Sequence, residues 1–180
     1  MTREMTHRRR SLLAPALLAG GLLLTAGCGA GTDAAPPVPP VPPVDNAKDA
    51  RGQDPCALLG AEQLAQFGLP ASEPGTRVAE GARCEWRGAG SVSLTVTLFT
   101  GGGGLATLAR NSESTTARVR VEGYPALETF TGQGEFCQYD VGVAPDQVVM
   151  ASMENGVPDS CTALQSVLPA ILANLPAYQG

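Results

Sequence analysis

Four cysteines in the body of the chain constrain its fold more than any other feature. Cys28 lies near the start of the 180 residues, and Cys56, Cys84, Cys137 and Cys161 follow. An even number of cysteines in an exported chain is typical of a disulfide framework, and four cysteines allow three pairings. We expect Cys56–Cys84 and Cys137–Cys161, because these bridges close local loops of similar size. A zinc site is the competing use of four cysteines, but the close CxxC spacing that favours zinc is absent from the sequence.

The N-terminal segment has the pattern of a secretory signal peptide. Residues 1–10 carry four arginines and one acid, and an apolar run rich in Leu and Ala follows over residues 11–26. Pro15 and two glycines interrupt this run, which is shorter than the ~20 residues that a membrane-spanning helix needs. We therefore expect residues 1–27 to be removed on export, in preference to an uncleaved anchor.

A lipid attachment signal ends this segment. The sequence Leu24-Thr25-Ala26-Gly27-Cys28 resembles the bacterial lipobox, with Thr25 in place of the commoner Leu. It predicts that Cys28 becomes a lipidated N-terminus on the extracytoplasmic face of the cell membrane, where two acyl chains give stable anchoring. The alternative is an ordinary signal peptide whose Cys28 joins a disulfide. Arg9-Arg10 also resembles a twin-arginine export signal, and the sequence leaves the choice between this route and the general secretory route open.

Composition separates a linker from a folded body. Residues 28–53 contain the tract PPVPPVPPV over residues 36–44, which predicts a stiff polyproline II spacer between membrane and domain. Recruitment of a proline-binding domain is the alternative, although such domains are chiefly intracellular. The composition is globular from Asp54, and we expect one domain over residues 54–176 and a short tail over residues 177–180.

The residue pattern predicts an α+β domain. Asp54-Pro55 is typical of a helix start, and a short helix is expected over residues 61–67. Alternating apolar and polar residues predict a hairpin around residues 84–86 and 91–100. A helix over residues 105–110, four more strands and a last helix capped by Asp159 or Ser160 follow. Those strands are expected near residues 117–122, 126–130, 136–143 and 147–153. The economical architecture is an antiparallel sheet covered by helices and stapled by two disulfides.

Several segments of this body carry a family resemblance. They are Asp54-Pro55-Cys56-Ala57-Leu58-Leu59, Phe67-Gly68-Leu69, Cys84-Glu85-Trp86, Gly123-Tyr124-Pro125-Ala126 and the late Cys161. With the lipobox and the spacer, the chain resembles the actinobacterial lipoproteins built around domain of unknown function 3558. Gly60 stands where such proteins often carry a Ser or Thr helix cap. The resemblance implies a surface-exposed lipoprotein, and it carries over no catalytic residue.

The residues for common catalytic chemistry are missing from the expected mature chain. The one histidine, His7, lies in the signal segment, and the one lysine, Lys48, lies in the linker. Imidazole-based catalysis and a serine–lysine dyad are therefore not expected. A paired-carboxylate hydrolase is the remaining enzyme alternative, because several acids lie in or near strands: Glu85, Glu122, Glu128, Glu135 and Asp140. Solvated strand edges are the simpler explanation of these acids. We expect no enzyme activity, no cofactor and no bound metal.

Three side chains are candidates for contact with a ligand. Arg118 and Arg120 project from one face of an expected strand, where they would grip an anionic group, although a solvated face is the simpler interpretation. Trp86 lies next to Cys84 and most simply packs on a disulfide in the core. The run Gly101–Gly104 lacks the Lys-Ser/Thr of a phosphate loop and is interpreted as a flexible connection.

The charge balance of the chain narrows the classes of partner that we expect it to bind. The net charge of −5 and pI of about 4.8 exclude a generic nucleic-acid binder. Removal of residues 1–27 takes away one acid of 17 and four bases of 12, leaving a mature chain of net charge −8. We expect a noncatalytic binding or accessory module that acts on an unidentified protein or small molecule through a concave apolar patch. The alternative is a carrier of a hydrophobic small molecule or lipid in the cell envelope.

Overall fold

A computed structural model describes residues 40–70, 76–78, 81–112, 116–156 and 159–180, and the backbone alone of residues 76–78. The expected signal peptide, Cys28 and the first part of the proline tract lie outside the described residues. The described residues fall within one compact unit, Pro37–Gly180.

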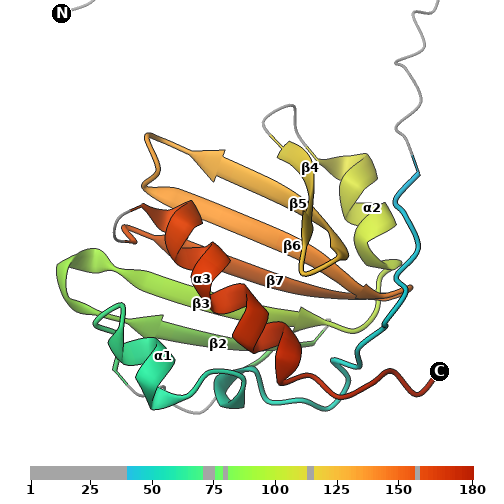
Figure 1. Cartoon of the computed structure of the whole chain (residues 1–180), viewed down its shortest axis with the longest axis horizontal. Coiled ribbons are helices and arrows are strands. Elements are labelled where there is room, and N and C mark those ends of the chain that lie inside the picture. The colour runs from blue at the N-terminus through green and yellow to red at the C-terminus, as the bar shows by residue number, and fades with distance from the viewer. Residues whose placement is uncertain (1–39, 71–75, 79–80, 113–115, 157–158) are drawn as a thin grey trace, which may run out of the picture. The chain divides into compact units, whose positions relative to one another are not determined.

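A seven-stranded sheet forms the centre of the described domain, and every neighbouring pair of strands is antiparallel. The strand order is β1-β2-β3-β7-β6-β5-β4 (Figure 1). The strands are β1 (Thr76–Val78), β2 (Gly81–Arg87), β3 (Ser93–Phe99), β4 (Thr116–Val121), β5 (Tyr124–Thr131), β6 (Phe136–Ala144) and β7 (Gln147–Glu154). The helical elements are η1 (Pro55–Ala57), α1 (Ala61–Ala65), η2 (Ala89–Ser91), α2 (Gly104–Asn111) and α3 (Ser160–Ala173). The α+β fold class expected from the sequence is confirmed.

The main core lies between one face of the sheet and the helical elements η1, α1 and α3. Figure 1 shows α3 lying across this face, with α1 on the same side. Alternation along the strands supplies the apolar residues: Val96 of β3 lies opposite Ala151 of β7, and both are fully buried. Side chains of alternate residues point to one face, so this period-two pattern produces a dry side of the sheet.

A smaller core lies on the opposite face under α2. It joins Leu105 and Ala109 of α2 to Leu127 of β5 and Val148 of β7. Gly142 of β6 lets the helix approach closely, because a Cβ atom there would lie 3.0 Å from the Cβ atom of Leu105. Helices therefore cover parts of both faces of the sheet.

Aspartates cap two of the helix starts that the sequence predicts. The carboxylate of Asp54 accepts a hydrogen bond of 2.9 Å from the backbone N–H of Cys56, and the first turn is the 3₁₀ helix η1. The Asp159 carboxylate accepts one of 2.9 Å from the N–H of Thr162. Helix α3 continues through Pro169 to Ala173, whereas α1 ends two residues before the expected Phe67. The turn η2 and the short strand β1 were not expected.

Residues that composition assigned to the linker and the tail pack on the domain. The backbone N–H of Lys48 donates to the carbonyl of Val143, and that of Tyr178 donates to Ala47. Gln147, fully buried, accepts a 2.6 Å hydrogen bond at its Oε1 from the N–H of Ala50. The folded unit thus includes chain on both sides of residues 54–176.

Both expected disulfides are present. Cys56–Cys84 joins η1 to β2 with 5.2 Å between Cα atoms, and Cys137–Cys161 joins β6 to the first turn of α3 with 5.0 Å. All four residues belong to the main core or pack against it. Each bridge therefore fastens a helical segment to the same face of the sheet.

Removing either bridge should destabilise the domain. The bridges span 28 and 24 residues, and loop-closure entropy gives each about 3–4 kcal/mol. We expect the pairs Cys56→Ala with Cys84→Ala, and Cys137→Ala with Cys161→Ala, to lose comparable unfolding free energy in urea titrations. Alanine avoids burying a hydroxyl at Cys84 and Cys137. An unchanged free energy of unfolding in either double variant would contradict this account.

Candidate functional site

An open groove lies beside the edge strand β4, on the face of the sheet that α2 covers. It has a volume of about 390 Å³. Arg118 and Arg120, two of the three candidate ligand-facing residues, line it and are exposed. The remaining lining residues are apolar: Pro40, Val41, Pro42, Leu105, Val119, Pro125, Ala126 and Leu127. The groove provides the concave apolar surface that the sequence analysis expected.

The strand pairing explains why the two arginines share this groove. Arg118 lies opposite Leu127, and Arg120 lies opposite Pro125, in the antiparallel pair of β4 and β5. Val119, between the arginines, packs on the main core of the other face. The Nη1 group of Arg120 donates a hydrogen bond to the carbonyl of Gly123, which holds this guanidinium at the β4–β5 turn.

Three separate segments build the apolar walls. Leu105 comes from α2, Leu127 from β5, and Val41 from the folded end of the proline tract. Leu105 and Leu127 are buried members of the smaller core, and Val41 packs against that core. The ten lining residues include two cations and no carboxylate. The groove thus combines apolar walls with two guanidinium groups.

Trp86 lies elsewhere. Its side chain is 1% exposed and belongs to the main core together with Cys84, on β2 near the opposite edge of the sheet. Its indole Nε1 is buried and has no hydrogen-bond partner among the described residues. The structure therefore places Trp86 as a core residue and does not bring it together with the arginines.

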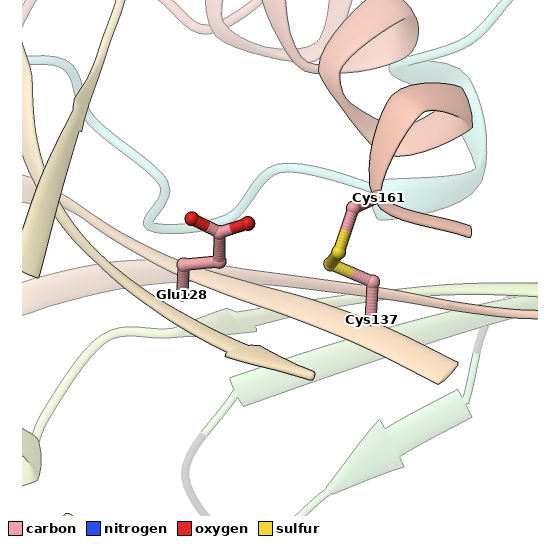
Figure 2. Close-up of side chains that lie close together, drawn as sticks. All are labelled: Glu128, Cys137 and Cys161. Atoms are coloured by element: carbon pink, nitrogen blue, oxygen red, sulfur yellow. A yellow bond between two sulfur atoms is a disulfide. The ribbon is translucent and has the colours of Figure 1, made fainter. Parts of the chain in front are cut away.

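A glutamate lies next to the Cys137–Cys161 disulfide. Glu128 lies beside both sulfur atoms, and the side-chain ligand atoms of the three residues are within 4.8 Å of one another (Figure 2). The sulfur atoms are bonded to each other, so they offer no thiolate to a metal ion. Sequence patterns gave no signal for this grouping of Glu128 with the bridge.

Glu128 is instead part of a hydrogen-bond chain. Its Oε1 accepts a 2.9 Å hydrogen bond from the hydroxyl of Tyr139, which accepts one of 2.8 Å from Nε2 of Gln165 in α3. Burial is the main cause that raises the pKa of Tyr139 above its ordinary value. The hydroxyl therefore stays protonated and donates to Glu128. This chain fastens α3 to β5 and β6 beside the disulfide.

Asp140 is a correction to the sequence analysis, which explained it as a solvated acid at a strand edge. It lies on the central strand β6 and is only 6% exposed. Nε2 of Gln138 donates to both carboxylate oxygens, at 3.0 and 3.1 Å. Burial raises its pKa to about 6, and the Gln138 hydrogen bonds partly offset the rise.

The partly and fully buried acids do not form a catalytic pair. Asp140 lies opposite Leu127, and Glu128 is the next residue along β5, so the two carboxylates point to opposite faces of the sheet. Glu85 is paired with Arg83 and Arg87 in surface ion pairs.

The fold and the groove define a disulfide-stapled α+β domain with helices on both faces of an antiparallel sheet. A family model described as "Protein of unknown function (DUF3558)" matches residues 23–174. The chain belongs to this family, as its cysteine and Asp-Pro-Cys motifs indicated. No curated protein and no solved structure matches the chain. Among the described residues, no helix has the length and apolar character to cross a membrane.

The buried carboxyl of Asp140 should make stability depend on pH. Its pKa is about 6 in the folded protein against an ordinary 3.8, so the folded state keeps a proton that the unfolded chain has lost. The free energy of unfolding should therefore fall by roughly 3 kcal/mol as the pH rises from about 3 to about 7. Urea titrations across this range should show the fall in the natural protein and not in Asp140→Asn.

Comparing the natural protein with Asp140→Asn isolates the contribution of one titrating group, the carboxyl of Asp140. The pKa of Asp159 is lowered, chiefly by the hydrogen bond from the backbone of Thr162, and this contribution is lost as the pH falls. Both proteins share it, so it cancels in the difference. Parallel pH profiles for the natural protein and Asp140→Asn would show that burial does not control this carboxyl.

Proposed function

We propose that this chain is a surface-exposed lipoprotein of the actinobacterial type, anchored to the extracytoplasmic face of the cell membrane through lipid on Cys28. The folded domain acts as a noncatalytic binding or accessory module. The observation that carries this function is the open groove beside β4, with apolar walls and two arginines. A groove of about 390 Å³ lies within the range of roughly 300–1,000 Å³ typical of ligand sites.

The anchor is supported by sequence and by chain geometry. The lipobox-like residues precede Cys28, and two disulfides in the domain suit an oxidising compartment. From Cys28 to Pro40, where the described chain begins, the backbone spans at most roughly 40 Å. The spacer thus holds the groove within a short distance of the membrane, while the acidic mature chain is repelled by anionic surfaces.

The noncatalytic character is supported by the placement of the ionisable groups. The groove presents two guanidinium groups and no carboxylate among its lining residues, which suits binding and charge neutralisation and lacks a general base. Asp140 and Glu128 point to opposite faces of the sheet. Lys48 is engaged at the domain surface, where its Nζ donates to the carbonyl of Leu175 at 3.1 Å.

A carrier of a hydrophobic small molecule or lipid is the second candidate function. Its support is the apolar lining contributed by α2, β5 and the proline tract. The described groove is open to solvent, and the main core on the other face of the sheet is filled by residues such as Val141, Leu164 and Leu168, which are fully buried. This geometry favours a surface-bound ligand over a fully enclosed one.

Cys28→Ala should abolish lipid attachment and release the domain from the membrane fraction. The lipobox motif carries this expectation, and two acyl chains are the only anchor that it supplies. Metabolic labelling with an alkyne palmitate analogue in an actinobacterial host measures it. The double variant Cys56→Ala and Cys84→Ala is the control and should keep the label. A labelled Cys28→Ala protein would rule out this attachment site.

Native mass spectrometry tests the binding function. Residues 29–180, which retain the compact unit that begins at Pro37, should be four protons lighter than the reduced chain because two disulfides form. We expect a molecule that co-purifies with this protein, or a partner that is crosslinked to it in native envelopes. Whichever of the two is found should be lost in the double variant Arg118→Glu with Arg120→Glu. A clean mass together with no crosslinked partner would contradict a binding module.

A further inference from the structure

We infer that the groove beside β4 is occupied by the chain's own proline tract, in which Val38 packs one helical turn beyond Val41. The tract is then the occupant that any other ligand or partner of the groove must displace. The placement of Val38 is independent of the proposed binding function, whereas this regulatory consequence rests on it.

The two described valines of the proline tract both face the domain. Val41 is half-buried and packs against the smaller core, and Val44 is half-buried and packs against the main core. The prolines between them, Pro42 and Pro43, are exposed. A polyproline II helix has three residues per turn, so residues three apart lie on the same side of it. The tract therefore presents a row of valines to the domain.

Val38 is the third member of this row. It precedes Val41 by the same three residues that separate Val41 from Val44, which is about 9 Å along a polyproline II helix. Figure 1 shows the start of the described chain passing beside α2. Pro40, with which the described chain begins, lines the groove together with Val41. One further turn thus brings Val38 to the groove on the same side of the tract as Val41.

The groove offers apolar contacts for this continuation. Leu105 of α2 and Leu127 of β5 line it, and both belong to the smaller core against which Val41 packs. Its volume of about 390 Å³ lies near the lower end of the roughly 300–1,000 Å³ of ligand sites, so a short apolar segment suits it. A valine that packs here removes its own surface and that of the groove from water.

The tract loses little conformational freedom when it packs. Proline fixes the backbone angle φ, so a proline-rich segment is extended before it makes contact. The described chain after the tract is already attached to the domain. The hydroxyl of Tyr124 donates a 2.7 Å hydrogen bond to the carbonyl of Asn46, and the N–H of Lys48 donates one of 2.8 Å to Val143. Packing of Val38 therefore orders only three more residues.

A docked Val38 changes the reach of the anchor and the access to the groove. The chain from Cys28 to Val38 covers ten residue steps, which span at most roughly 36 Å. A molecule that enters the groove competes with Val38, so its apparent affinity falls with the fraction of chains in which the tract is docked. The tract thus acts as a strap over the binding groove.

Methyl NMR spectroscopy of residues 29–180, labelled with ¹³C at the valine and leucine methyl groups, tests the inference. This protein keeps every described residue. We expect nuclear Overhauser cross-peaks from the methyl groups of Val38 to those of Leu105 or Leu127. Cross-peaks from Val41 to the same residues are the internal reference, because Val41 packs on this core. Val38→Ala assigns the Val38 signals, and a synthetic peptide of residues 33–44 gives their positions in the free tract.

Two insertion variants test the three-residue register. One proline inserted between Pro39 and Pro40 rotates Val38 by about 120° relative to Val41, and should abolish the cross-peaks of Val38 to the groove. The sequence Val-Pro-Pro inserted between Pro40 and Val41 keeps the register. In this matched control the cross-peaks should pass from Val38 to the inserted valine.

Two results would overturn the inference. One is a Val38 with the methyl shifts of the free peptide and no cross-peaks to the groove, in a protein that shows those of Val41. The other is a set of Val38 cross-peaks that survives the single-proline insertion. A free Val38 together with a co-purifying molecule or a crosslinked partner would refute the strap and leave the proposed function standing. A docked Val38 in a protein without either would support the strap and contradict the proposed function.

Discussion

The attachment of two helical segments to one face of the sheet is the constraint on which the rest of the structure depends. Aromatic residues make up only 4% of the chain, so few large side chains are available to fill a core. The bridges Cys56–Cys84 and Cys137–Cys161 instead hold η1 and the start of α3 against β2 and β6. Such crosslinks lower the entropy of the unfolded chain. They also hold the helical segments close to the sheet, where the apolar residues of α3 pack on those of the strands. The Gln165–Tyr139–Glu128 chain adds a polar fastening at the same end of α3.

The two faces of β6 show how one strand serves two purposes. Cys137, Tyr139 and Val141 face the main core, while Gln138, Asp140 and Gly142 alternate with them on the other face. That second face is covered by the eight residues of α2, seated on Gly142, and by the folded end of the proline tract. The groove lies where this short helix and the tract leave the β4 edge open.

The parts of the molecule that local pattern encodes could be predicted from the sequence. Alternation indicated strands β2 to β7, and spacing indicated the disulfide pairs, because both depend on residues close together in the chain. The groove depends on distant segments: Val41 lies 86 residues before Leu127, and the proline content around it is typical of a linker. Asp140 was misjudged for a related reason. An acid in a strand gives no local sign of whether distant parts of the chain will bury it. Here two hydrogen bonds from Gln138 offset part of the cost of burying Asp140.

The arginine pair and the net charge of the mature chain act over different distances. Charges beyond roughly 8 Å are largely screened at physiological ionic strength, so the potential inside the groove depends chiefly on the residues that line it, which include Arg118 and Arg120. An extended anionic surface, in contrast, meets the net charge of the whole body, which is −8 for residues 28–180 with their 8 bases and 16 acids.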